Sequence, residues 1–322
     1  MMDRIDPELS EPLKKFLNSG GRSDLHNISS TRARQAEMLA VMKAQMPAIR
    51  DVGCEDRLLP GTPNIPDVAV RIYRPADYST LLPALLWIHG GGYVFGNLEQ
   101  DDFKAKNLTA TCQCITVCVN YRLAPENPFP AALEDCYLAL KWLVSNSDIL
   151  GIDKTRIVIG GASAGGGLAA ALALLIRDRG EVSFSFQMLL CPMIDDRNIL
   201  PAGESLPDTL VWTRENNRIG WQSYLGHSFG DEQLSPYAAA YRAPDLRGLP
   251  PAYIAIGELD LFLNESMTYA QRLIQAGIPT ELHIYPGAFH GFEMTAPDAN
   301  ISRRFITDYN QALKQALYRN HL

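Results

Sequence analysis

Apolar positions along the chain fall into two patterns, and the first predicts strands. Several short runs are apolar at almost every position, which is typical of strands buried on both faces of a parallel sheet. These runs, some of them ending in a loop, lie at 83–92, 114–122, 156–161, 184–193 and 251–262, and a strand is also expected at 280–287. A further strand is expected at 68–73, where apolar and polar residues alternate as they do on a half-exposed sheet.

The second pattern repeats every three to four residues and predicts helices between the strands. The expected helices lie at 129–146, 164–180, 265–277 and 301–320. In the first of them one face carries Ala132, Cys136, Ala139 and Leu143. Regular alternation of strand and helix predicts an α/β fold with a mostly parallel central sheet and helices on both of its faces.

Two segments depart from this alternation. Residues 1–50 are helical in pattern and partly amphipathic, and a helix at 31–46 would place Ala36, Leu39, Met42 and Met46 near one face. Residues 195–245 are helix-like and rich in aromatic side chains, with no strand pattern. We expect this second segment to be an insertion lying above the sheet.

Composition and charge narrow the range of functions. The 322 residues are 47% hydrophobic, which suffices for a sizeable core, and their net charge of −7 comes without any cluster of Lys or Arg. A nucleic-acid partner is therefore not expected. The longest helical apolar stretch, Leu168 to Ile176, is far shorter than the roughly 20 residues that cross a bilayer, so we expect no stable membrane insertion.

The cysteines point to a reducing compartment. The N-terminal residues contain no continuous apolar core of the secretory kind, so we expect free thiols and a cytoplasmic protein. Three of the six cysteines lie in the segment CQCITVC, and one interpretation of this cluster is a metal site. We favour a buried strand with cysteine used as a small apolar residue, because the spacing fits no common zinc pattern. No metal is expected.

Candidate chemistry appears between the strand at 156–161 and the helix that follows it. The segment Gly161-Ala162-Ser163-Ala164-Gly165 has the form G-x-S-x-G, which in a strand–turn–helix context exposes a serine hydroxyl at a helix N-terminus. The alternative is a glycine-rich helix start with an idle serine. A phosphate-binding loop is disfavoured because no lysine follows the glycines.

A second glycine-rich segment, His89-Gly90-Gly91-Gly92-Tyr93, ends an earlier expected strand. At the same sheet edge as Ser163, its backbone N–H groups would suit an oxyanion hole. A plain glycine-rich turn is the competing interpretation.

Together these motifs resemble those of the hormone-sensitive-lipase-like group of the α/β-hydrolase fold, also called bacterial family IV esterases. The matching segments stand in the family's order from about residue 55 onward, at 89–93, 121–135, 161–167 and 287–292. The resemblance implies a helical cap over the sheet. We therefore expect residues 1–50 to be the N-terminal part of the cap, 51–194 the first part of the hydrolase core, 195–245 the cap insertion, and 246–322 the second part of the core.

A base and an acid are needed to activate the serine. His290 is our candidate base, because it follows the last expected strand and completes the chain order serine, acid, histidine of this fold. The preceding strand is followed by Glu258, Asp260 and Glu265. Asp260 matches the acid of the resembled family, although Leu261 replaces a proline of the family's pattern; Glu258 is the second choice.

The resemblance implies a serine carboxylesterase that cleaves short- to medium-chain esters through an acyl-enzyme, without a cofactor. On this interpretation Ser163 attacks, His290 transfers the proton and Asp260 orients the imidazole. The N–H groups of Gly91, Gly92 and Ala164 are expected to form the oxyanion hole. The candidate substrate-binding side chains are Tyr93, Phe95 and Trp212.

Three further interpretations remain open at this point. One is a non-catalytic small-molecule receptor on the same fold, and another is a hydrolase of amides or thioesters. A homodimer is possible, because the last strand and the terminal helix lie at a sheet edge in this fold. Finally, Arg122 and Glu126 are expected either to pair near the site or to remain exposed charges.

Overall fold

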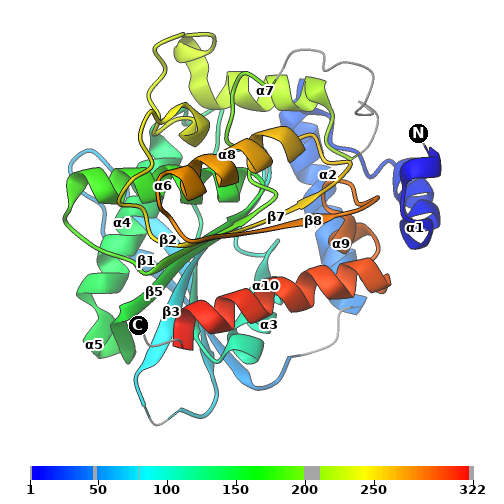
Figure 1. Ribbon diagram of the computed structural model, residues 1–322. Helices are drawn as coiled ribbons and strands as arrows, with labels where there is room; N and C mark the ends of the chain where they lie inside the picture. Colours follow the sequence, from blue (N-terminus) through cyan, green and yellow to red (C-terminus); the bar gives the residue numbers. More distant parts are fainter. Residues whose placement is uncertain (1, 46–48, 79, 199–210, 319–322) are drawn as a thin grey trace.

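The computed structural model describes residues 2–45, 49–78, 80–198 and 211–318. Its centre is an eight-stranded sheet in the order β1-β2-β4-β3-β5-β6-β7-β8 (Figure 1). The strands are β1 (Val52–Leu59), β2 (Val68–Pro75), β3 (Leu82–Ile88), β4 (Ile115–Val119), β5 (Ile152–Ala162), β6 (Phe186–Leu190), β7 (Ala252–Gly257) and β8 (Thr280–Tyr285). β2 pairs antiparallel with β1 and β4, and all other neighbours are parallel, which confirms the predicted mostly parallel sheet.

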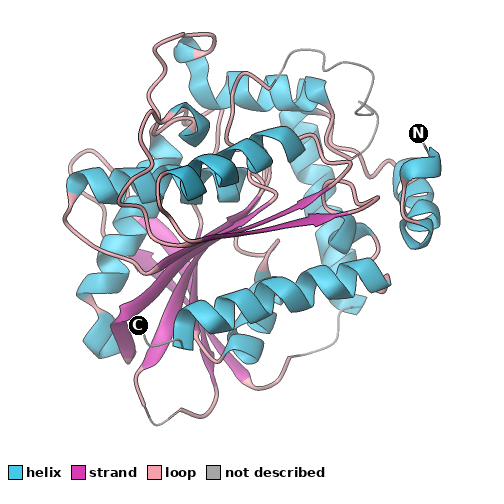
Figure 2. Ribbon diagram, viewed as in Figure 1, coloured by secondary structure: helices cyan, strands magenta, loops and turns pink. Residues whose placement is uncertain are grey.

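Helices cover both faces of this sheet, as Figure 2 shows. They are α1 (Pro7–Asn18), α2 (Ile28–Gln45), α3 (Asp102–Cys112), α4 (Ala131–Ser145), α5 (Ser147–Leu150), α6 (Ala164–Arg179), α7 (Arg214–Leu225), α8 (Leu263–Gln275), α9 (Phe292–Thr295) and α10 (Asn300–Tyr318). Short 3-10 turns are η1 (Met2–Arg4), η2 (Leu25–Asn27), η3 (Gly226–Ser228) and η4 (Ala240–Arg242). α4, α6 and α8 pack on one face, and α3 and α10 on the other.

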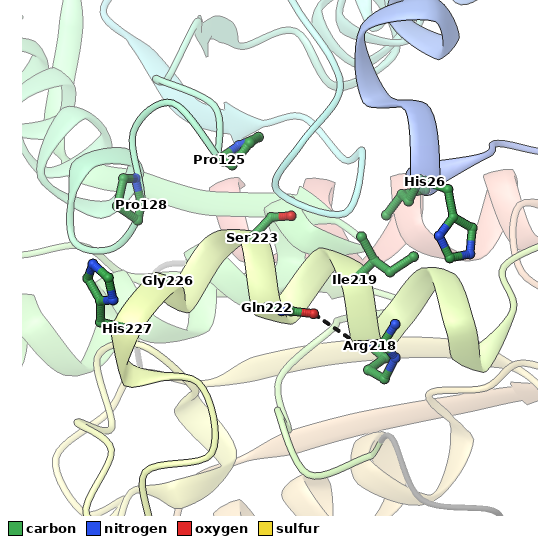
Figure 3. A pocket seen from close by; sticks show the side chains of 10 residues that line it. His26, Pro125, Pro128, Arg218, Ile219, Gln222, Ser223, Gly226 and His227 are labelled. Carbon is green, nitrogen blue, oxygen red and sulfur yellow. Dashed lines mark hydrogen bonds between the residues drawn. The ribbon is translucent and has the colours of Figure 1, made fainter.

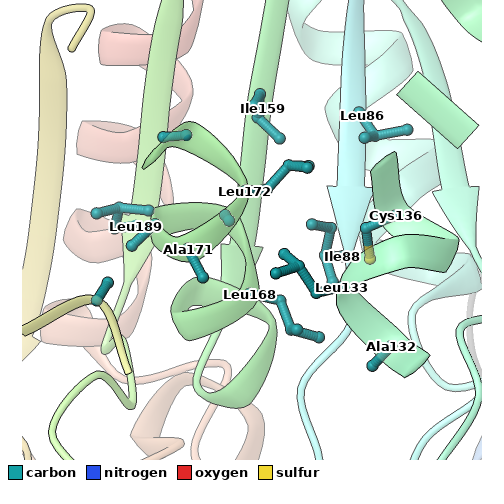
Figure 4. Packing of buried hydrophobic residues seen from close by; sticks show 14 of the residues in the cluster. Leu86, Ile88, Ala132, Leu133, Cys136, Ile159, Leu168, Ala171, Leu172 and Leu189 are labelled. Atoms are coloured by element: carbon teal, nitrogen blue, oxygen red, sulfur yellow. The ribbon is translucent and has the colours of Figure 1, made fainter. Parts of the chain in front are cut away.

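The alternation of side chains along each strand divides the core into two halves. In β3, Leu86 and Ile88 point toward α4 and α6, whereas Leu85 and Trp87 point toward α3 and α10. Figure 4 shows the first half, where Leu168 of α6 lies among these side chains. Each fully buried side chain of this kind contributes about 1.5–3 kcal/mol. The result is a frame that holds the carboxyl ends of the parallel strands, where the candidate residues lie.

Of the two apolar helix faces predicted from the sequence, the one on α4 is buried in the core and the one on α2 is not. On α4, the predicted face of Ala132, Cys136, Ala139 and Leu143 is buried, as the 3.6-residue period requires.

On α2 the predicted apolar face does not become a core face. Ala36 and Met42 are exposed and Leu39 is only half-buried, while Met46 lies outside the described residues. Among its described side chains at 28–43, the buried one is Thr31, at 2% exposure, so polar contacts near the start of the helix attach it to the body.

The segments predicted to form a cap come together above the strand ends. The described part of 195–245 contains α7, η3 and η4 and no strand. The Asn216 side-chain amide of α7 donates to the carbonyl of Ser23 near η2 (3.0 Å), which joins the two segments. Their division from the core remains a prediction. Among the described residues, none of the helices has the length and hydrophobicity to cross a membrane.

Candidate active site

The Ser163 turn is a sharp reversal between β5 and α6. Ser163 has φ +56°, a value that non-glycine residues adopt with strain and mainly at functional turns. A Cβ at Gly161 would collide with the carbonyl of Gly165, so a side chain at the first glycine would prevent the turn. The Ser163 N–H donates to the Leu190 carbonyl of β6 at 2.8 Å, which fixes the turn to the neighbouring strand.

Three segments that are distant in the chain meet at this hydroxyl. His290, from the turn between β8 and α9, accepts at Nε2 from Ser163 Oγ, 3.0 Å away. Its Nδ1–H donates to Asp260 Oδ2 at 2.7 Å. Asp260 follows β7, is 1% exposed, and accepts at Oδ1 from the backbone N–H of Phe262 at 2.9 Å. This arrangement can pass a proton from the hydroxyl to the imidazole and keep the imidazole in one tautomer.

Opposing effects act on the imidazole of His290. Burial disfavours its charged form, but the neighbouring Asp260 and Cys191 together outweigh burial, and the pKa of His290 is raised well above its ordinary value. The ring is further held edge-on by Phe262, with centroids 5.2 Å apart. Sequence reasoning did not single out Phe262 as a contact of the base.

The predicted oxyanion loop lies directly against the Ser163 turn. A Cβ at Gly90 would come within 2.9 Å of the carbonyl of Ala162, which shows how closely the two backbones approach. Gly91 and Gly92 have φ of +122° and +59° at the carboxyl end of β3. Ala164 opens α6, and the first N–H groups of a helix have no partner within it. The predicted donors therefore stand at one edge of the sheet.

His89 supports this loop from within. Its ring stacks on Tyr121 with centroids 4.2 Å apart, and its Nδ1–H donates to the carbonyl of Gly90 at 2.8 Å. The Tyr121 hydroxyl in turn donates to the His89 carbonyl at 3.0 Å. Burial lowers the pKa of His89, so the ring is kept neutral.

Arg32 of α2 also holds the oxyanion loop, a contact that no motif in the sequence indicates. Its Nε donates to the carbonyl of Val94 at 2.8 Å, and its Nη2 donates to the carbonyl of Ala124 at 2.8 Å. The two terminal nitrogens bind Glu126 in a bidentate pair at 2.8 and 3.0 Å. The N-terminal segment is thus attached to the residues that follow the three glycines.

The expected pairing of Arg122 with Glu126 is wrong. Arg122 instead binds Asp135 of α4, with its Nη2 at 2.8 Å from Oδ1, while its backbone N–H donates to Oδ2 at 2.8 Å. The Asp135 side chain is fully buried, so it requires these donors, whereas Glu126 is mostly exposed and faces α2.

The three predicted substrate-binding residues have different environments. Tyr93 and Phe95 are each 2% exposed and lie in the core, where Tyr93 stacks on Tyr224 and donates to the carbonyl of Met193 at 2.8 Å. Aromatic packing thus places both of these candidate substrate contacts in the core. Trp212 is half-buried, and its ring centroid lies 6.5 Å from that of His290.

A cavity of about 590 Å³ lies between η2, the loop before α4, and α7 (Figure 3). None of the proposed catalytic residues lines it. Its lining combines apolar side chains with polar ones and consists of Leu25, His26, Pro125, Pro128, Arg218, Ile219, Gln222, Ser223, Gly226 and His227.

Comparison with known proteins gives a consistent picture. Residues 85–294 match a family model described as alpha/beta hydrolase fold. Carboxylesterase NlhH of Mycobacterium tuberculosis is 33% identical over 291 residues, covering 89% of this chain and 88% of its own. Ethyl acetate hydrolase of Pseudomonas putida is 30% identical over 300 residues, covering 89% and 92%.

Among solved structures, a bacterial heroin esterase is 37% identical, covers 99% of both chains and superposes with a TM-score of 0.93. The structural match extends over nearly the whole chain. The chain therefore belongs to the α/β-hydrolase fold family, in its hormone-sensitive-lipase-like branch.

Proposed function

We propose that the chain is a serine carboxylesterase with Ser163 as nucleophile, His290 as general base and Asp260 as the residue that orients the imidazole. The observation that carries the proposal is the continuous hydrogen-bonded series from Ser163 Oγ to His290 and on to Asp260, at 3.0 and 2.7 Å. The names of the relatives, carboxylesterase and ethyl acetate hydrolase, support ester hydrolysis.

The reaction follows from this geometry. Ser163 Oγ attacks the ester carbonyl carbon while His290 Nε2 takes the hydroxyl proton, and Asp260 stabilises the imidazolium that results. The N–H groups of Gly91, Gly92 and Ala164 stabilise the oxyanion. His290 then protonates the leaving alcohol, and water activated by the same imidazole releases the acid from Ser163.

The substrate class is proposed to be esters with short to medium acyl chains. Trp212 is the predicted substrate contact that remains half-exposed beside His290, and we assign it a wall of the substrate site. The relative named ethyl acetate hydrolase favours a small acyl group.

The test is hydrolysis of p-nitrophenyl esters of increasing acyl length by the wild type and by Ser163→Ala. We expect turnover by the wild type, falling for long chains, and a loss of about 10⁴-fold or more in kcat for Ser163→Ala. Ser228→Ala, which changes an exposed serine, serves as the control. Equal turnover by wild type and Ser163→Ala would overturn the proposal.

The alternative functions are separated by two further measurements. A receptor without catalysis would not form a covalent adduct with an organophosphate at Ser163, which mass spectrometry detects. Matched ester, thioester and anilide probes decide among acyl substrates, and we expect the ester to be the preferred one.

We also propose a cytoplasmic, reducing location and assembly into a homodimer. The location is supported by six unpaired cysteines, one of them exposed. Dimerisation is supported by β8 at the edge of the sheet, with Ile284 38% exposed. Cell fractionation tests the first and light scattering after size exclusion tests the second.

A further inference from the structure

Cys191 is a thiol beside the triad that the proposed mechanism does not use. It directly follows β6, has φ +39°, and its N–H donates to the carbonyl of Ala255 of β7 at 2.7 Å. All six cysteines lie in the described residues: four are buried in the body, Cys54 is exposed on β1, and Cys191 is half-buried at the carboxyl edge of the sheet. Of these thiols, Cys191 is the one grouped with potential metal ligands.

Three different donor atoms converge at this point. Cys191 Sγ, a carboxylate oxygen of Asp260 and a ring nitrogen of His290 all lie within 4.8 Å of one another. Thiolate, imidazole and carboxylate are the ligands that Zn²⁺ prefers. With bonds of about 2.0–2.3 Å, tetrahedral geometry requires donors about 3.3–3.8 Å apart, so shifts of about 1 Å or less complete such a site.

We propose that Cys191, Asp260 and His290 form an inhibitory site for Zn²⁺. Binding forms bonds from zinc to sulfur, nitrogen and oxygen, the thiol proton passes to solvent, and no electrons are transferred. If zinc binds Nδ1 of His290, the Nδ1 proton moves to Nε2; if zinc binds Nε2, the proton stays on Nδ1. In both cases Nε2 is occupied and cannot take the proton of Ser163, so metal binding and proton transfer exclude each other. The inhibitory consequence rests on the proposed function, whereas metal binding itself does not.

The metal-free state is compatible with catalysis. Without zinc, the two ring nitrogens of His290 are paired with Asp260 and Ser163, at 2.7 and 3.0 Å. Zinc therefore changes the state of the site by replacing a proton with a metal ion.

The test is titration of the full chain with zinc chloride in a non-chelating buffer. Binding is followed by competition with a fluorescent zinc indicator, and activity with p-nitrophenyl acetate, each variant being compared with its own metal-free rate. Wild type and Cys54→Ser are expected to bind zinc and lose activity, which EDTA restores. In Cys191→Ser and Cys191→Ala, zinc affinity and inhibition are expected to weaken at least about tenfold, because even outer contacts of metal ligands typically matter that much.

A separate readout does not depend on activity or on the folding of a Cys191 variant. Co²⁺ added to Cys54→Ser is expected to give a thiolate-to-cobalt charge-transfer band, which prior blocking of Cys191 with a methanethiosulfonate removes. Ser163→Ala is expected to bind zinc like the wild type; if it also retained hydrolysis, the proposed function would fail while the metal site stood. Absence of the cobalt band, or equal zinc inhibition of wild type and Cys191→Ala, would refute the site.

Discussion

Gly92 and Trp212 show how narrowly single residues are constrained around the proposed oxyanion hole. Gly92 has φ +59°, and a Cβ there would meet the ring of Trp212. Gly180, at the end of α6, has a similar φ of +64° but nothing within 4 Å of the position of a Cβ. The two glycines therefore separate the effect of backbone strain from the effect of the contact with Trp212.

Gly92→Ala is expected to lower kcat by about 100-fold, because the added methyl displaces either an oxyanion donor or Trp212. Gly180→Ala shares the unfavourable φ and is expected to cost about 1 kcal/mol of unfolding free energy without a change in kcat. Ester hydrolysis and urea unfolding of both variants give the comparison. An equal loss of kcat in both variants would show that strain alone is responsible.

The charge of Asp260 sets a testable pH dependence. His290 must be neutral to accept a proton, so activity falls at low pH as it becomes protonated. Because Asp260 raises the pKa of His290, Asp260→Asn is expected to move the acidic limb of kcat/KM to lower pH. The plateau is also expected to fall, by about 10⁴-fold. A limb that stays in place or moves to higher pH would contradict the assignment.

The role of a single residue can be predicted when a motif in the neighbouring sequence points to it. Ser163 stands in a motif whose glycines are required by the turn itself, so the local sequence suffices. Asp260 was chosen over Glu258 only by resemblance; in the structure Glu258 binds the N–H of Gly287 at 2.9 Å instead of His290. Arg32 lies 62 residues from Val94 and has no motif around it.

At the level of elements, α2 acts mainly through one side chain. Arg32 near its start binds two carbonyls beside the oxyanion loop, while the apolar residues farther along are exposed, with Val41 at 61% and Met42 at 42%. The helix therefore contributes a positioning contact to the site and little apolar burial to the core.

Arg32→Ala is expected to lower kcat by about tenfold with a smaller change in KM, because the loop that carries the oxyanion donors loses its outer support. Arg32→Lys is not expected to restore it, since a lysine cannot reproduce the bidentate pair with Glu126. Arg34→Ala is the matched control, because Arg34 lies on the same helix but donates to the carbonyl of Arg22. An unchanged kcat in Arg32→Ala would remove Arg32 from the positioning role.

Among the elements that were not predicted, β1 and α3 were missed for different physical reasons. β1 is an edge strand with mostly exposed residues and a glycine, so its sequence lacks both alternation and an apolar run. α3 does bury one face, but that face includes Asp102 and Thr109, which a pattern of apolar residues does not register. Tyr73 donates to the Asp102 carboxylate at 3.0 Å and satisfies it there.

Across the whole molecule, buried hydrogen bonds connect segments that are far apart in the chain and that the pattern of strands and helices does not link. Glu265 of α8 is 4% exposed, and its Oε1 accepts from the N–H of Ile194 at 2.8 Å, 71 residues away. Met193, the residue before Ile194, donates its own N–H to the Ser163 carbonyl at 3.0 Å. The succession of strands and helices predicted the sheet, because buried parallel strands are apolar throughout. It carried no information on these long-range hydrogen bonds.

Glu265 gives a prediction for stability. Burial raises the pKa of Glu265 well above its ordinary value. The unfolded carboxyl titrates at about pH 4.3. Between that pH and the folded pKa, the folded chain therefore binds more protons than the unfolded one. Stability is lost as pH rises through that range. Urea unfolding at about pH 5 and pH 8 is expected to show a smaller loss for Glu265→Gln than for the wild type. A loss of the same size in both proteins would contradict this.

The sparse burial of α2 has a consequence for how the protein fails when warmed. Helices that bury little apolar surface open at a lower free energy than the global transition. Since this helix carries Arg32, its detachment would release the oxyanion loop while the sheet stays intact. Initial rates measured against temperature are expected to decline several degrees before the far-ultraviolet circular dichroism signal changes, and coincident curves would argue that α2 melts only with the rest of the chain.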